Sequence, residues 1–97
     1  MIPRFYLDAD DYDAVQLDPD DIEDFTRDWT RYLDGDTISA SAWTASGVTV
    51  DSSSNTTTSA TVTLSGLKRD PAEVTNQITT AAGRKKSWTF RVYEREM

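Results

Sequence analysis

The sequence contains neither cysteine nor histidine. Without cysteine, the chain cannot form a disulfide, bind a metal through thiolates or use a cysteine nucleophile. Without histidine, it lacks the commonest general base and the commonest metal ligand of proteins. The catalytic mechanisms and metal sites that depend on either residue are therefore excluded.

Long apolar segments are missing as well. No apolar run approaches the length of about 18 residues that a membrane-spanning helix requires. The chain begins MIPRFYLD and turns acidic too early for the basic start, apolar stretch and cleavage site of a signal peptide. We therefore expect a soluble protein that has no membrane partner and is not exported by the usual route.

Basic residues are few and unevenly distributed. Residues 1–36 contain twelve acidic residues and three arginines, whereas residues 37–97 contain five acidic and seven basic residues, and the net charge is −7. Because neutralising phosphates requires a basic face, this balance argues against a nucleic-acid partner.

Apolar residues are also scarce, at 37 % of the 97 residues. The length fits one domain, and the composition indicates a thin core in which aromatic side chains supply much of the buried area. We therefore expect Trp29, Trp43 and Trp88 to pack in the core, since each aromatic residue buries roughly 150–250 Å². The alternative is an aromatic platform that binds sugars.

Residues 1–17 show no sustained period and combine aspartates with large apolar residues. Because disordered tails usually contain few aromatic residues, we expect an extended acidic N-terminal arm that docks onto a neighbouring protein. Phe5, Tyr6, Leu7 and Tyr12 are the expected contacts. A solvated acidic leader is the alternative.

Nothing in the sequence predicts an active site or a cofactor. A calcium loop that began at Asp8 would have Tyr12 and Asp13 where an oxygen ligand and a glycine are required, so no metal site is predicted. The serines lack a nucleophile motif, and no pair of carboxylates has a distinctive spacing. The sequence therefore indicates a protein that is not an enzyme.

The domain is expected to span residues 18–97. The residues DPDD at 18–21 have turn chemistry, and the residues after them favour a short strand over 22–29 and one helical turn over 29–33. A helix across 18–33 is the competing interpretation, because its apolar residues also fit a period of 3.6.

Beyond Gly35 the pattern favours strands, because threonine, serine and valine dominate and polar and apolar residues alternate. The expected strands span 37–44, 48–50, 57–65, 72–80 and 86–95. The serine-rich residues 51–55 are interpreted as a turn. Ile38 and Trp43 have opposite parity, which predicts a β-bulge between them.

These elements predict an all-β fold, an immunoglobulin-like antiparallel β-sandwich of six to seven strands, with a partly open barrel as the alternative. The basic cluster Arg84, Lys85 and Lys86 would then lie at the same end as Asp34 and Asp36. The cluster either pairs with those aspartates or binds an acidic neighbour.

Several stretches resemble small tailed-bacteriophage proteins described as fiber-tail adaptors. They are DPDDIEDF at 18–25 leading to Asp28 and Trp29, GDTI at 35–38 with Trp43, and VTNQITTAAGR at 74–84. The resemblance covers about residues 18–95. It implies a structural β-sandwich, present in many copies of a symmetric virion assembly built in the host cytoplasm, that joins fibers to other tail or neck proteins. A capsid decoration or head-tail joining protein and a carbohydrate- or surface-binding module are the alternatives.

Overall fold

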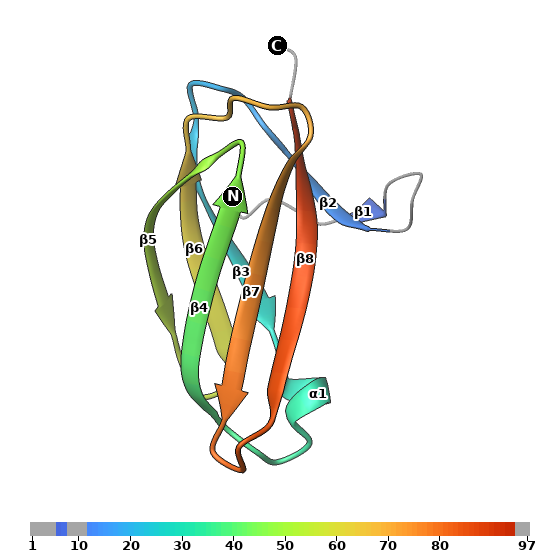
Figure 1. Ribbon diagram of the computed structural model, residues 1–97, viewed down its shortest axis with the longest axis vertical. Helices are drawn as coiled ribbons and strands as arrows, with labels where there is room; N and C mark the ends of the chain where they lie inside the picture. The colour runs from blue at the N-terminus through green and yellow to red at the C-terminus, as the bar shows by residue number, and fades with distance from the viewer. Residues whose placement is uncertain (1–5, 8–11, 95–97) are drawn as a thin grey trace.

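The computed structural model describes residues 6–7 and 12–94, which form two β-sheets packed face to face (Figure 1). One sheet has the strand order β1-β2-β8-β7-β4 and the other has the order β3-β6-β5. The elements are β1 (Tyr6–Leu7), β2 (Asp13–Leu17), β3 (Ile22–Asp28), α1 (Thr30–Leu33), β4 (Ile38–Ser46), β5 (Thr49–Asn55), β6 (Ser59–Ser65), β7 (Ala72–Thr80) and β8 (Lys85–Glu94).

The strand order confirms the predicted immunoglobulin-like sandwich. Strands β3, β6 and β5 form one sheet, and β4, β7 and β8 lie side by side in the other, as in that fold class. The pairing is antiparallel throughout except that β2 runs parallel to β8, from Asp13 opposite Phe90 to Leu17 opposite Glu94. An entirely antiparallel arrangement is therefore incorrect at this edge.

The extended arm expected over residues 1–17 is not confirmed, because Asp13–Leu17 is strand β2 of the larger sheet. Ala14, Val15 and Leu17 are at most 1 % exposed. Alternation explains the difference, since Val15 and Leu17 lie on one face of the strand and reach the core. Of the expected docking residues, Phe5 lies outside the described part of the chain.

The core between the sheets has two parts. The larger part contains Phe25, Val62, Leu64 and Phe90, and burying each such side chain contributes about 1.5–3 kcal/mol relative to leaving it exposed. The smaller part lies around α1, where Trp29 and Leu33 pack against buried residues of β4, β6 and β7. The expected helical turn is therefore confirmed. It covers the end of the core that lies at the bottom of Figure 1.

Two local expectations about the strands are confirmed and one was wrong. The expected strand over 22–29 is β3, and the competing helix across 18–33 does not form, because Ile22–Asp28 pairs along its length with β6. The turn expected at 51–55 is the body of β5, whose side chains are almost all exposed and therefore polar. The predicted irregularity in β4 is confirmed, since the register with β7 shifts between Ile38 and Ala40.

The three tryptophans contact the core, but to different degrees. Trp29 is 2 % exposed and its Nε1 donates to Oδ1 of the buried Asn76 at 2.9 Å. Trp43 and Trp88 are half-buried, and both rings pack against Phe90. The expected core role is thus met fully by Trp29 and in part by the other two.

Candidate functional site

One end of the sandwich gathers the loops between α1 and β4, between β5 and β6, and between β7 and β8 (Figure 1). We call it the loop end, defined by residues 30–37, 56–58 and 81–86. In immunoglobulin-like domains, loops at one end of the sandwich form binding surfaces, because the strands hold them rigidly and their side chains are free to vary.

Arg84 ties two of these loops together. Its Nη2 donates to the carbonyl oxygen of Leu33 at 3.0 Å and to Oδ2 of Asp36 at 3.2 Å. The hairpin itself is closed by the Thr80 N–H donating to the Arg84 carbonyl, while the Arg84 N–H donates to the Thr80 hydroxyl. The expected pairing of the basic cluster with Asp36 is therefore present.

Asp36 is the acceptor at the centre of this arrangement. Hydrogen bonds from the Thr80 hydroxyl, the Thr37 N–H and Arg84 hold the pKa of the Asp36 carboxyl below its usual value. The ionised carboxylate thus serves as a fixed link between the hairpin and the loop after α1.

Tyr32 lies under the cations of the same end. The Arg84 guanidinium is 4.9 Å and the Lys86 ammonium 6.0 Å from the centre of its ring. Both distances fit cation–π contacts, each about 0.5–1 kcal/mol at an exposed site. Lys85 and Lys86 are exposed, so the loop end presents basic groups to solvent beside the half-buried ring of Tyr32.

The structure places the expected contacts of the N-terminal region elsewhere. Tyr6 and Leu7 form β1, which pairs with β2. Tyr12 is 39 % exposed and its ring lies 4.1 Å from the guanidinium carbon of Arg91. Because Tyr12 directly precedes β2, beside the middle of β8, it does not join Arg84 at the loop end. The described residues expected to contact partners therefore lie in two separate regions, the loop end and the segment around β1 and Tyr12.

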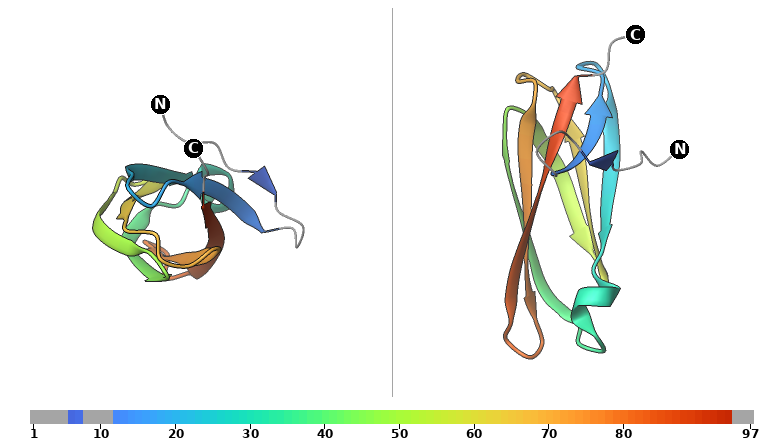
Figure 2. Two further views of the ribbon diagram at one scale, coloured as in Figure 1. Left: turned by 90° about the horizontal axis from the view of Figure 1, so that it is seen from above. Right: turned by 90° about the vertical axis from the view of Figure 1, so that its right-hand side faces the viewer.

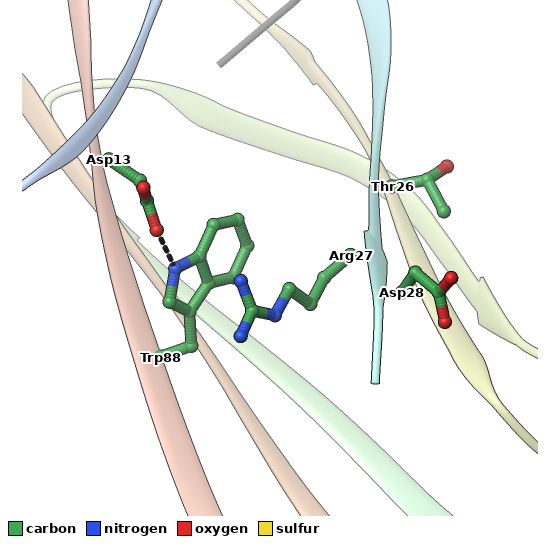
Figure 3. Close-up of a pocket in the computed structure, with 5 residues that line it drawn as sticks. All are labelled: Asp13, Thr26, Arg27, Asp28 and Trp88. Carbon is green, nitrogen blue, oxygen red and sulfur yellow. Dashed lines mark hydrogen bonds between the residues drawn. The ribbon is translucent and has the colours of Figure 1, made fainter. Parts of the chain in front are cut away.

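A hollow of about 260 Å³ opens between β2, β3 and β8 (Figure 3). Nε1 of Trp88 donates to Oδ2 of Asp13 at 2.6 Å, and the guanidinium of Arg27 lies 4.8 Å from the Trp88 ring. Thr26 and Asp28 project from the other face of β3 (Figure 3). The carboxylate of Asp28 accepts two hydrogen bonds from Thr30, the main reason that its pKa lies below the usual value.

A protein-family profile described as "Podophage GP4 fiber-tail adaptor protein gp77" matches residues 17–93. The chain belongs to this family. The match confirms the resemblance to the fiber-tail adaptors. It supports a structural role in a phage, as the family's description states. No curated protein matches the chain.

The match to the adaptor family includes the whole loop end but not Tyr12 or Asp13. Within the described ranges, no group of three or more acidic side chains is placed to hold a metal ion. Among the described helices, none is long and apolar enough to cross a membrane.

All three tryptophans pack against the core, an arrangement that does not favour the exposed platform of a sugar-binding module. Trp29 is enclosed, and Trp43 packs against both parts of the core. The ring of Trp88 is approached by Phe90 at 4.9 Å and by Arg27. Trp43 and Trp88 are half-buried and none of the three rings is fully exposed, so this alternative gains no support from the structure.

Sequence reasoning missed two residues of these sites. Arg27 lies on the inward face of β3 between the rings of Trp29 and Trp88. The sequence contains a signal for this position, because residues 25, 27 and 29 alternate along the strand and therefore share one face. Tyr32 could have been found only from the pairing of the hairpin with α1, for which the sequence has no local signal.

Proposed function

We propose that this chain is a non-enzymatic virion protein that joins fibers to the tail or neck of a tailed bacteriophage. The observation that carries the proposal is the family match, which extends from the end of β2 nearly to the end of β8. Virion assembly in the host cytoplasm and the presence of several symmetrically arranged copies are parts of the same proposal.

An adaptor needs at least two contact surfaces, one for each protein that it joins. We assign the loop end to one partner. Its exposed Lys85 and Lys86, next to the ring of Tyr32, fit an acidic surface on a neighbouring tail, neck or fiber protein. The hydrogen bonds of Arg84 hold the backbone of this end in place, so little order has to be gained on binding.

The second surface of the proposal is the N-terminal region with Phe5, Tyr6, Leu7 and Tyr12. Aromatic residues at interfaces fill pockets of the partner, and the aspartates around them suit a basic rim. Because Tyr12 and the loop end lie at different places along β8, the two regions are able to contact different proteins at the same time.

The experiment compares phage particles that carry variants of this protein. We expect Lys85→Glu/Lys86→Glu to leave the sandwich folded and to yield particles without fibers, or without the variant chain. Lys68→Glu/Arg69→Glu makes the same charge change in the β6–β7 loop at the opposite end (Figure 1) and should assemble normally.

Electron microscopy of the particles reads the outcome. Loss of the whole gene product should give particles that retain head and tail but lack fibers. Density for the chain on the head surface, or fibers that remain attached when it is missing, would contradict an adaptor role. Normal particles from the Lys85→Glu/Lys86→Glu variant would contradict the assignment of the loop end alone.

A further inference from the structure

One side of the sandwich is almost free of charge. The chain has ten basic and 17 acidic residues, yet residues 37–67 contain a single one, Asp51. At the usual share of about 25 % charged residues, a stretch of this length would contain about eight. These residues form β4, β5 and β6, and apart from Asp51 and Asn55 the exposed side chains of β4 and β5 are small or hydroxyl-bearing. We call Ile38–Asn55 the β4–β5 side.

The β4–β5 side also contains two strand edges. Within the described residues, β4 pairs only with β7, and β5 pairs only with β6. The second edge of each strand therefore has backbone N–H and C=O groups that are not paired with another described strand, although β4 and β5 lie near each other where the chain turns between them. Figures 1 and 2 show both strands on the side of the molecule opposite β1.

The open edges of β3 and β8 carry charged side chains, which protect them from pairing with another strand. Strand β3 carries Glu23, Asp24, Arg27 and Asp28. The part of β8 that β2 leaves uncovered begins with two lysines. Charged side chains on an edge strand discourage pairing with another chain, because such pairing would bury them. Strand β4 has neither a charge nor a proline over its nine residues.

We infer that the β4–β5 side is the surface on which a second copy of this chain docks, with β4 pairing edge to edge with a strand of that copy. The net charge of −7 is the reason for choosing a second copy. Two copies repel each other wherever acidic surfaces meet, whereas each β4–β5 side contributes a single charge, that of Asp51.

The geometry of the side suits such a contact. At about 3.3 Å per residue, β4 offers an edge about 30 Å long. A shallow hollow of about 260 Å³ lies at its upper end, lined by Thr44, Ala45, Ser46, Glu73 and Thr75, and has room for a side chain of the neighbouring copy. The scarcity of charged residues is also typical of the central part of protein interfaces.

The inference rests on the proposed multi-copy role only in assigning the contact to copies within a virion. The contact itself is tested with the purified chain. Sedimentation velocity at increasing concentration, up to about 1 mM, should show reversible self-association. Hydrogen exchange compared at low and high concentration should show slower exchange of the Ile38–Ser46 amides at high concentration. Both measurements use the unmodified protein and require no variant to fold.

Variants then locate the contact. Ala42→Glu/Thr44→Glu places two carboxylates on exposed positions of β4, and like charges brought together should raise the dissociation constant at least about tenfold. The control Gln16→Glu/Ser87→Glu adds the same charge at exposed positions of β2 and β8 and should change the constant much less.

A monomer at every concentration would overturn the inference, and so would equal effects of the two double variants. Slower exchange confined to β3 or β8 would likewise overturn it, because it would move the contact to another edge. Each of these results leaves the adaptor role intact, since fiber attachment is measured separately on particles.

Discussion

Asn76 is a buried polar residue whose hydrogen bonds should contribute strongly to the free energy of unfolding. It is 0 % exposed, and its side chain takes part in three hydrogen bonds. Oδ1 accepts from Trp29 Nε1, while Nδ2 donates to the hydroxyl of Ser41 and the carbonyl of Ala42 at 2.9 and 3.1 Å. The residue thus joins β7 to β4 in its own sheet and to the segment directly after β3.

Asn76→Ala should destabilise the protein by about 2–4 kcal/mol. The substitution removes these hydrogen bonds and leaves the buried Trp29 N–H without an acceptor, which alone costs about 1–3 kcal/mol. A small cavity adds to the loss. Against a total stability of about 5–15 kcal/mol this is a large share, and urea denaturation monitored by circular dichroism measures it directly.

Asn76→Asp gives a sharper test because it keeps the shape and adds a charge. A carboxylate here would face the Ala42 carbonyl in a buried site, so the folded-state pKa of the new group should lie above its unfolded value of about 3.9. Between the two pKa values the folded state holds one proton more than the unfolded state. The free energy of unfolding of the variant should therefore fall by about 1.4 kcal/mol per pH unit relative to wild type as the pH rises.

Parallel pH dependence of the Asp variant and the wild type would refute the reasoning, as would a loss below about 0.5 kcal/mol for Asn76→Ala. Either result would mean that water reaches this position or that the hydrogen bonds contribute little.

Three further predictions concern other parts of the structure. Gly47→Ala should cost about 1–3 kcal/mol more than Gly83→Ala in urea denaturation, because only at Gly47 would the new Cβ lie 2.6 Å from another side chain, although both residues have positive φ. Trp43→Phe should cost about 1 kcal/mol less than Trp29→Phe, since the Trp43 Nε1 has no acceptor among the described residues. Asp36 has a lowered pKa, so its contribution is present above the unfolded pKa and lost as the pH falls through the folded pKa. Asp36→Asn should accordingly lose less melting temperature than wild type between pH 6 and pH 3, by calorimetry, and an equal loss would contradict this.

The sequence predicted the fold wherever alternation and turn chemistry agree. Ala60, Val62 and Leu64 alternate with polar residues, and all three are buried as expected. Residues 72–80 were predicted with the observed bounds of β7, because glycine, proline and charged residues mark the flanking turns. The family match supports the adaptor resemblance, which composition alone does not supply.

The expectations failed where composition masked a strand. Asp13–Leu17 comes after an acidic segment, and only its pairing with the distant β8 makes it part of the sheet. The serines of β5 lie at an edge where side chains stay in water, so they show no alternation. The contact of Arg84 with Asp36 could be predicted from the turn positions, whereas its contact with Tyr32 depends on how α1 lies, which the sequence pattern leaves open.

Asn76 also links stability to the proposed docking edge. Its amide donates to Ser41 and Ala42, which lie in the middle of β4. In Asn76→Ala the backbone of β4 keeps its pairing with β7 but loses this inner support, so β4 should open locally more often than the rest of the sheet. We therefore expect the substitution to accelerate hydrogen exchange, relative to wild type, more at residues 41–43 than at residues 61–63 of the central strand β6. Self-association should also become weaker. Exchange that accelerates equally in both strands would show that the substitution acts only on global unfolding, and the proposed coupling between the core and the docking edge would be wrong.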